Sequence, residues 1–366
     1  MSNELRDADK ALLEELFSKT KRAAPKAPAP PKNPQDKLKI SLDPTREQNV
    51  GIVLSYLKLP VSEIKEALLT LDDGKLSYDI LGGLQSILPN AEEVRIVEPY
   101  LTEPPEVQAR LSMAAQFFLM TATIPRIGNR IECWLVRNSF DLTQDQVLGE
   151  LGPLNKAANA LKNSDKWEKM LKLILRTGNF MNQGTRVGDC QGFRISDLEK
   201  LGNCRTTDNK SNLLQTLVGI CLKTDRDLLD FTSEMAPVRQ ACVIDINETR
   251  QAITELNKSM TTLVRELNLR EMEKKEAVKQ GTQVMADAFS SKMGDFYNSK
   301  KDELQEMWDQ LSNTEQTLKL LGEYYGENPA DFQAADFFQN ITSFCKQVET
   351  NKKQLAHEVY EGKDIP

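Results

Sequence analysis

The residue types that carry most enzyme chemistry are sparse in this chain. There is one histidine, His357, so a Ser-His-Asp triad or a multi-histidine metal site would have to be built around it. Neither a GxGxxG nor a GxxxxGK[ST] phosphate loop occurs. The 54 acidic residues include no pair in an obviously catalytic setting. We therefore expect no enzyme activity, no cofactor and no metal site.

The six cysteines do not form a redox or zinc motif. They are scattered, with no CxxC pair among Cys133, Cys190, Cys204, Cys221, Cys242 and Cys345. Reduced, mostly buried thiols of a cytosolic protein are the expected state.

Composition narrows the class of protein further. The chain has 366 residues, 40% hydrophobic and 28% charged, which suffices for two or three globular domains. No apolar stretch approaches the roughly 20 residues that a membrane-spanning helix needs, and no secretory signal is visible. The formal net charge of −7 argues against a broad nucleic-acid footprint. We expect a cytoplasmic protein without membrane insertion or nucleic-acid binding.

The first forty residues divide into a short helix and a proline-rich segment. Helical spacing over residues 4–19 places one apolar face on Leu12, Leu13, Leu16 and Phe17. Residues 23–36 carry five prolines, a density that neither a helix nor a central strand tolerates. An extended linker is the preferred interpretation, and a ligand for a proline-binding module is the alternative.

Helical periodicity then continues nearly to the end. Asp43 is a suitable N-cap and Pro44 a suitable first helical residue. The expected helices span 44–59, 61–71, 77–87 and 91–99, with one or more over 105–140 that bend near Ile124 and Pro125, followed by 143–162, 166–177, 195–201 and 212–224.

A glycine-rich loop interrupts this pattern after residue 177. Gly178, Gly184, Gly188 and Gly192 cannot all lie in one continuous helix. Gly178 is expected to cap the preceding helix in a left-handed conformation, with Asn179 and Asn182 bonding backbone groups and Phe180 and Met181 packing.

Heptad spacing follows beyond Pro237. The apolar residues Ile246, Ile253, Leu256, Met260, Leu263 and Leu267 fall at a and d steps, as do Leu304, Trp308, Leu311 and Leu318. Two long helices result, one of which would reach about 65 Å over 238–281. We favour an intramolecular seam between them over a long parallel dimer. The predicted fold class is all-α and elongated.

Several segments together resemble the formin homology-two domain, the actin-assembly domain of formins. Residues 171–217 resemble its signature, with the loop Gly178-Asn179-Phe180-Met181-Asn182, a G-F-x-[IL] segment starting at Gly192, a basic loop from Arg205 to Lys210 and a leucine-rich helix at Leu213. Three further segments are similar to family elements. The entry into the knob helix is matched by residues 42–52, the E-Q-F…[IV]-P-R-L element by 115–118 with 124–127, and the helix that closes the lasso by 13–17. The resemblance covers about residues 11–350.

The resemblance implies an elongated all-α domain with a knob, a three-helix-bundle coiled coil and a post. On this sequence it implies a truncated lasso helix at 1–22, a Pro/Lys-rich linker at 23–42, a knob at 43–140, a post region with the GNFMN loop at 141–237, long coiled-coil helices at 238–350 and a polar tail at 351–366. The implied function is binding of actin monomers and filament barbed ends, supporting nucleation and capping or processive elongation of unbranched filaments. The alternative is a helical scaffold or tether without actin activity.

The resemblance also implies roles for individual residues. Ile52 matches the knob isoleucine expected to enter an apolar cleft of actin, and Arg46, Arg205 and Lys210 are expected actin contacts. From the residues alone, Ile52 also fits a buried stripe with Leu54 and Leu57. Arg205 alone would equally be a solvated loop charge. Arg126 and Arg130 are expected to be structural.

Assembly is where the sequence departs from the family. Formin homology-two domains form head-to-tail rings in which each lasso wraps the partner's post, where Gly178, Asn179, Phe180, Met181 and Asn182 would line the pocket. The family lasso carries tryptophans before its L-E-E-L-F helix, but none of the ten residues before Ala11 is aromatic. The upstream proline-rich region that recruits profilin–actin is not in this sequence, and residues 25–34 are no substitute. We expect weakened self-association, giving a monomer or weak dimer at micromolar concentration.

Overall fold

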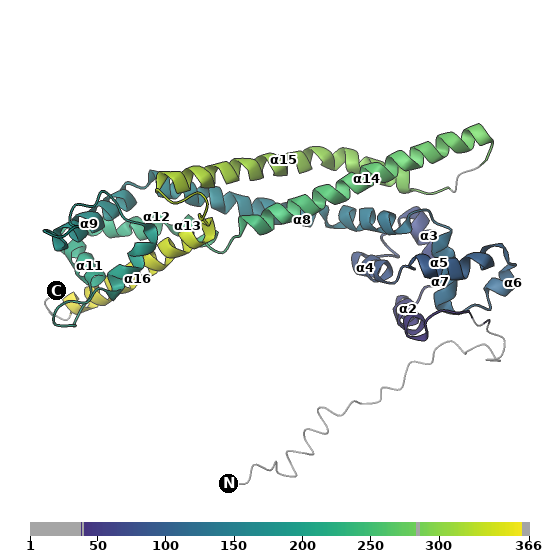
Figure 1. Cartoon of the computed structure of the whole chain (residues 1–366), viewed down its shortest axis with the longest axis horizontal. Coiled ribbons are helices and arrows are strands. Elements are labelled where there is room, and N and C mark those ends of the chain that lie inside the picture. The colour runs from purple at the N-terminus through teal and green to yellow at the C-terminus, as the bar shows by residue number, and fades with distance from the viewer. Residues whose placement is uncertain (1–37, 39, 283–285, 361–366) are drawn as a thin grey trace, which may run out of the picture. The chain divides into compact units, whose positions relative to one another are not determined.

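The computed structural model describes residues 38, 40–282 and 286–360. Within these residues the secondary structure is helical, and the one β feature is an isolated antiparallel bridge between Arg205 and Asn212. This confirms the all-α class. The chain separates into two compact units (Figure 1). One contains Pro89–Thr123 with the described part of Met1–Val61, and the other contains Ser62–Leu88 with the described part of Ile124–Pro366.

The first unit is built around helix α7, Met113–Ala122, which is apolar and buried along almost its whole length. Against it pack α2 (Pro44–Leu57), α5 (Ala91–Val97) and η2 (Glu98–Thr102), with the single turn α6 (Pro105–Gln108) between. Helix α2 begins as predicted, since the Asp43 side chain accepts a hydrogen bond from the backbone N–H of Arg46 at 2.8 Å. It ends at Lys58, which adopts a left-handed conformation.

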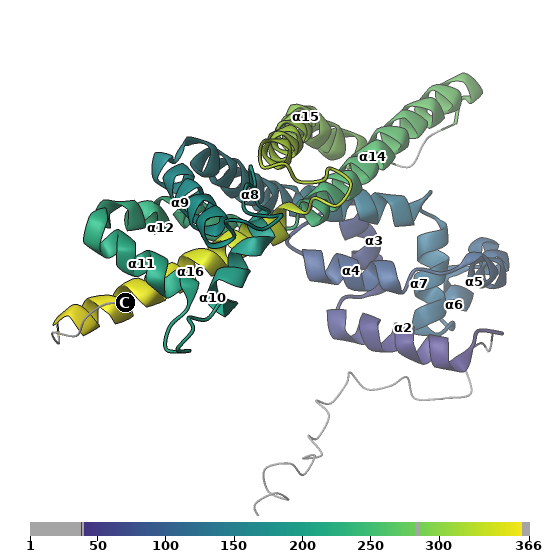
Figure 2. The same ribbon diagram turned by 60° about the vertical axis from the view of Figure 1, so that its left-hand side comes forward.

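The second unit contains three long helices that pack on one another. These are α8 (Ile127–Asn163), α14 (Ile246–Gln280) and α15 (Phe289–Tyr324), which run alongside each other in Figures 1 and 2. The predicted intramolecular seam is confirmed, because Ile253, Leu256, Met260, Leu263, Leu304, Leu311 and Leu318 are all buried. The short helices α3 (Val61–Thr70) and α4 (Tyr78–Ser86) match the helices predicted at 61–71 and 77–87 to within one residue at each end.

Three details of the long helices differ from expectation. Helix α14 begins at Ile246 rather than 238, because Asp245 caps it by accepting from the Asn247 N–H at 2.8 Å. Met307, not Trp308, is fully buried in the seam. Residues 127–163 form one helix instead of two, and it accommodates Pro153 within its length.

The remaining helices of the second unit surround an aromatic core. They are α9 (Asp165–Met181), η3 (Ile195–Glu199), α10 (Lys200–Asn203), α11 (Leu213–Thr224), η4 (Arg226–Asp230), α12 (Phe231–Glu234), α13 (Ala236–Ala241) and α16 (Ala334–Tyr360). The rings of Trp167 and Phe231 are 5.6 Å apart between centroids, and those of Phe231 and Phe344 are 6.0 Å apart. The Trp167 indole donates to the Tyr325 hydroxyl at 2.9 Å, which satisfies the one polar atom of this buried ring. This core holds the loops discussed below.

A partly buried ionic cluster joins the start of α8 to α14 and to the segment before α15. Arg126, in a left-handed conformation, donates to Glu266 at 2.7 Å and to Glu273 at 2.6 Å. Arg130 and Arg270 both donate to Asp287, at 2.9 and 2.7 Å. The expectation that Arg126 and Arg130 are structural is therefore confirmed.

Part of the sequence interpretation falls outside the described residues. This holds for the helix at 4–19, the lasso residues Leu12, Leu13, Leu16 and Phe17, nearly all of the linker at 23–42, and residues 361–366 of the tail. Helix α16 extends to Tyr360. Among the helices that the structure describes, none has the length and apolar character needed to cross a bilayer. The division into lasso, linker, knob, coiled coil and post stays a prediction.

Candidate partner-binding surfaces

Ile52 lies on the outer face of α2. Its side chain is 60% exposed, whereas Val50 and Leu54 on the same helix are buried against the core of the first unit. The alternative that placed Ile52 in the buried stripe with Leu54 is therefore wrong. An isolated exposed isoleucine is common on protein surfaces, so its meaning depends on its neighbours and on the kind of partner.

Arg46, one of the expected actin contacts, is engaged within the first unit. Its Nε donates to Oε1 of Glu93 at 3.0 Å, and its guanidinium lies 5.8 Å from the ring centroid of Phe118. Glu93 also accepts from the Asn90 backbone N–H at 2.8 Å, completing the capping box of α5. Arg46 thus helps fasten α2 to α5 and α7, and a contact with actin would have to use its remaining exposed surface.

The basic loop between Arg205 and Lys210 is a tightly bonded hairpin. The Thr206 hydroxyl donates to the Asp208 carboxylate at 2.6 Å and accepts from the Ser211 N–H at 3.2 Å. The hydrogen bond from Thr206 lowers the pKa of Asp208. Asn209 takes the left-handed conformation that closes the turn.

This hairpin presents its two cations to solvent. Arg205 and Lys210 are both exposed, and neither forms an ion pair with any residue that the structure describes. Their charges are therefore accessible to an acidic partner, although the Lys210 charge also helps to lower the pKa of Asp208 within the loop.

The GNFMN segment is more helical than predicted. Helix α9 continues to Met181, and the Asn182 N–H still donates to the Gly178 carbonyl at 3.0 Å. Gly178 is thus an ordinary helical residue, and the left-handed position is Gly184, with φ +79°. The expected packing of Phe180 and Met181 is also wrong, since these side chains are 78% and 54% exposed.

Asn179 closes the loop that follows, as predicted. Its side chain donates to the Cys190 carbonyl at 2.9 Å and accepts from the Cys190 N–H at 3.0 Å. Gly188 makes the closure sterically feasible, because a Cβ added there would lie 2.3 Å from the backbone oxygen of Asn182. The loop is therefore shaped by two specific residues.

An apolar pocket of about 240 Å³ opens behind this loop. Gly178, Asn179 and Asn182 line it, but Phe180 and Met181 lie on neighbouring exposed surface instead. Sequence reasoning missed most of the other lining residues, which are Ile174, Leu175, Val187, Cys190, Gly192, Phe193, Asp197, Lys200, Leu201 and Leu213. The apolar periodicity of residues 171–177 was the signal that could have identified Ile174 and Leu175.

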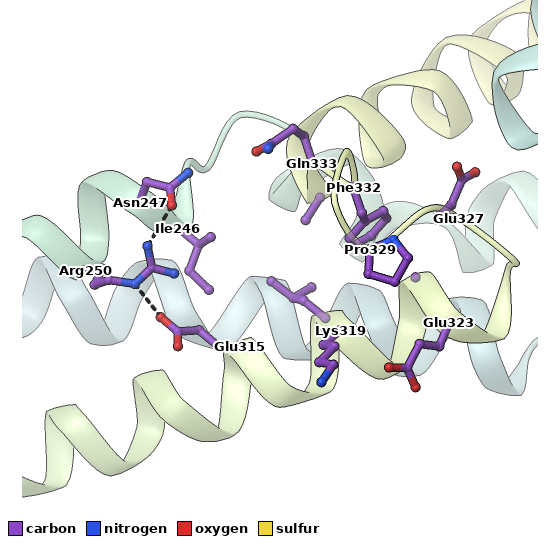
Figure 3. Close-up of a pocket in the computed structure, with 13 residues that line it drawn as sticks. Ile246, Asn247, Arg250, Glu315, Lys319, Glu323, Glu327, Pro329, Phe332 and Gln333 are labelled. Atoms are coloured by element: carbon purple, nitrogen blue, oxygen red, sulfur yellow. Dashed lines mark hydrogen bonds and ion pairs between the residues drawn. The ribbon is translucent and has the colours of Figure 1, made fainter.

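A second hollow, of about 290 Å³, lies where α14 begins, α15 ends and the loop before α16 returns (Figure 3). Arg250 crosses one side of it, donating to Glu315 at 2.7 Å and to Asn247 at 2.8 Å. Pro329 and Phe332 form another wall. None of the site residues expected from the sequence lines this hollow.

Comparison with known proteins identifies the family of this chain. The model of the Formin Homology 2 Domain matches residues 1–349. The chain therefore belongs to the formin homology-two family. It is 26% identical to Formin-like protein 13 of Arabidopsis thaliana over 96% of this chain, 28% to Formin-J of Dictyostelium discoideum over 93%, and 26% to human Protein diaphanous homolog 3 over 87%. It spans only 27%, 13% and 26% of those relatives' lengths, respectively.

Proposed function

We propose that this chain binds actin monomers and filament barbed ends, and thereby supports nucleation and capping or processive elongation of unbranched filaments. The observation that carries the proposal is the exposed position of Ile52 on α2, at the residue that matches the family's knob isoleucine. Membership of the formin homology-two family supports it. The role is binding rather than catalysis, and it places the protein in the cytoplasm with the actin cytoskeleton.

Ile52 can act as an anchor because 60% of its surface is exposed in the free chain. Inserting it into an apolar cleft removes that surface from water, which is worth about 1.5–3 kcal/mol for a fully buried side chain of this size. Anchors of this kind, rather than the surrounding contacts, carry most of an interface's binding energy.

Arg205 and Lys210 act at the rim of a second contact. Actin is acidic, so two exposed cations on this hairpin would raise the association rate and orient the encounter more than they would raise the affinity. Arg46 contributes less directly, because its Nε is already bonded to Glu93.

The pocket behind the GNFMN segment serves self-association. We assign its occupant as the apolar face of residues Leu12, Leu13, Leu16 and Phe17 from a second copy, joined head to tail. The exposed Phe180 and Met181 extend the apolar surface beside the pocket. Four apolar side chains offset only part of the cost of association, so we expect a monomer or a weak dimer at micromolar concentration.

Co-sedimentation with actin filaments tests the proposal. The chain should pellet with filaments saturably, with half-saturation at low micromolar concentration or below, and Ile52→Ala should abolish most of this binding. A chain that stays in the supernatant at every filament concentration would contradict the proposal and favour a helical scaffold without actin activity.

A further inference from the structure

The outer face of α2 carries a second exposed apolar side chain beside Ile52. Tyr56 is 83% exposed, the same as the most exposed apolar residue elsewhere in the described chain, Val243. Within the described residues Tyr56 makes no hydrogen bond and no ring contact. The fold of the first unit therefore gains almost nothing from this ring.

Helix geometry places the two side chains together. Residues four apart on an α-helix are about 6 Å apart along the axis and about 40° apart around it, so Ile52 and Tyr56 occupy one stripe. Val50 and Leu54 face the core, which directs this stripe away from the unit. Thr45 and Asn49 continue the stripe toward the start of α2, and all four residues are uncharged.

We infer that Tyr56 is a second anchor for actin, seated in the same apolar cleft as Ile52. The inference rests on the proposed function. It extends that function by adding Tyr56, one helical turn after Ile52, as a second contact residue. Continuity with Ile52 identifies the partner, because a protein that buries Ile52 must lie over the adjoining ring. An uncharged stripe also suits an apolar cleft, since no ionic group has to be desolvated.

A tyrosine is well suited to this position. Its ring supplies a large apolar area with few rotatable bonds, and its hydroxyl can remain at the wet edge of a cleft. Tyrosine is accordingly enriched among the residues that dominate binding energy.

Scattered exposed apolar residues elsewhere do not carry the same argument. Leu320 and Tyr324 on α15 are also four residues apart and exposed, but the Tyr324 ring packs on Tyr325 with centroids 5.1 Å apart. Tyr324 therefore provides a matched control, being an exposed tyrosine one turn beyond an exposed leucine in the other unit.

The test measures the affinity of the full 366-residue chain for filament barbed ends with Tyr56→Ala, Tyr56→Phe, Ile52→Ala, the double variant and Tyr324→Ala. Tyr56→Ala should weaken binding by about 5- to 30-fold, as expected for truncation of an anchor, and Tyr56→Phe should retain most of the affinity. Tyr324→Ala should bind like the unaltered chain. The double variant should lose less than the product of the two single losses, because both side chains fill one cleft.

Three outcomes would overturn the inference. If Ile52→Ala weakens binding and Tyr56→Ala does not, the second anchor is wrong while the proposed function stands. An equal loss in Tyr324→Ala would show that the effect is not specific to the α2 stripe. If the unaltered chain does not bind barbed ends, the inference and the proposed function both fail.

Discussion

Ile52 and Leu54 lie two residues apart on α2 and face opposite environments, with Ile52 exposed to solvent and Leu54 buried in the core of the first unit. A helix rotates by about 100° per residue, so two steps carry a side chain from the outer face to the core. The pair therefore separates two roles on one helix, since Leu54 can only stabilise the unit and Ile52 is free to meet a partner.

Substitution of each residue should show this separation. Leu54→Ala should lower the free energy of unfolding by about 2–5 kcal/mol, because it leaves a cavity in the core. Ile52→Ala should leave the melting temperature nearly unchanged and severely weaken actin assembly. Thermal unfolding combined with an assembly assay distinguishes the two, and a large loss of stability in Ile52→Ala would contradict the assignment of an exposed anchor.

Arg205→Asp should reduce barbed-end affinity and make association less sensitive to salt. The reason is that an exposed cation acts through long-range attraction, which salt screens over about 8–10 Å under ordinary conditions. Association rates measured across a salt series provide the readout. Arg265→Asp on α14, also an exposed arginine, is the matched control. If Arg205→Asp caps barbed ends as well as the unaltered chain at every salt concentration, Arg205 is only a solvated loop charge and the prediction is wrong.

Gly188→Ala should disrupt the wall of the 240 Å³ pocket, because the added Cβ would lie 2.3 Å from the Asn182 carbonyl oxygen. Gly149→Ala on α8 is the control, since a Cβ there meets nothing within 4 Å and Gly149 does not line the pocket. If the pocket serves self-association, sedimentation equilibrium should show a weaker dimer for Gly188→Ala than for Gly149→Ala. Identical association of the two variants would count against a role for this pocket.

The ionic cluster predicts a pH-dependent contribution to stability. The hydrogen bond from Arg126 lowers the pKa of Glu273 below its ordinary value of 4.5. A carboxylate whose pKa is lowered on folding stabilises the protein above its unfolded-state pKa, and loses that effect as the pH falls through its folded-state value. Glu273→Gln should therefore lower the melting temperature slightly at neutral pH, and the difference should vanish in acid. A difference independent of pH would contradict the ion pair.

Arg126→Ala should cost more than Glu273→Gln. It removes a partner of Glu266, whose side chain is only 1% exposed, although Arg126 itself is 29% exposed and Asn129 still donates to Glu266. The loss should therefore stay below the roughly 3–5 kcal/mol that breaking a fully buried ion pair typically costs. Urea unfolding at neutral pH measures the loss. Comparing Arg126→Ala with Glu273→Gln is informative because the Arg126 guanidinium bonds both Glu266 and Glu273, whereas Glu273→Gln affects only one of these two contacts.

Elements with strong local signals were predictable from the sequence. The Asp43 cap with Pro44 fixed the start of α2, and the heptad residues from Ile253 to Leu263 identified a buried seam, because cap chemistry and apolar periodicity depend on neighbouring residues alone. The family resemblance rested on short motifs in order, and the match over residues 1–349 confirms it.

Features that depend on distant contacts were not predictable in the same way. Whether Ile52 or Leu54 faced the core depended on where α7 packs. Phe180 and Met181 are exposed although Gly178 and Asn179 beside them line the pocket, a difference that local spacing does not reveal. Gly178 was mistaken for a helix end because a glycine is a common cap, yet the hydrogen bond from Asn182 continues the helix through it. The pocket walls at Val187 and Leu213 come from separate segments that the sequence pattern did not join.

The most direct test of the account is the growth rate of filament barbed ends from preformed seeds, measured against increasing concentration of the chain. Occupancy of barbed ends through Ile52 predicts a saturable slowing of growth, half-maximal at low micromolar concentration or below, that Ile52→Ala largely removes. Barbed ends that grow at the same rate at every concentration of the unaltered chain would contradict the account.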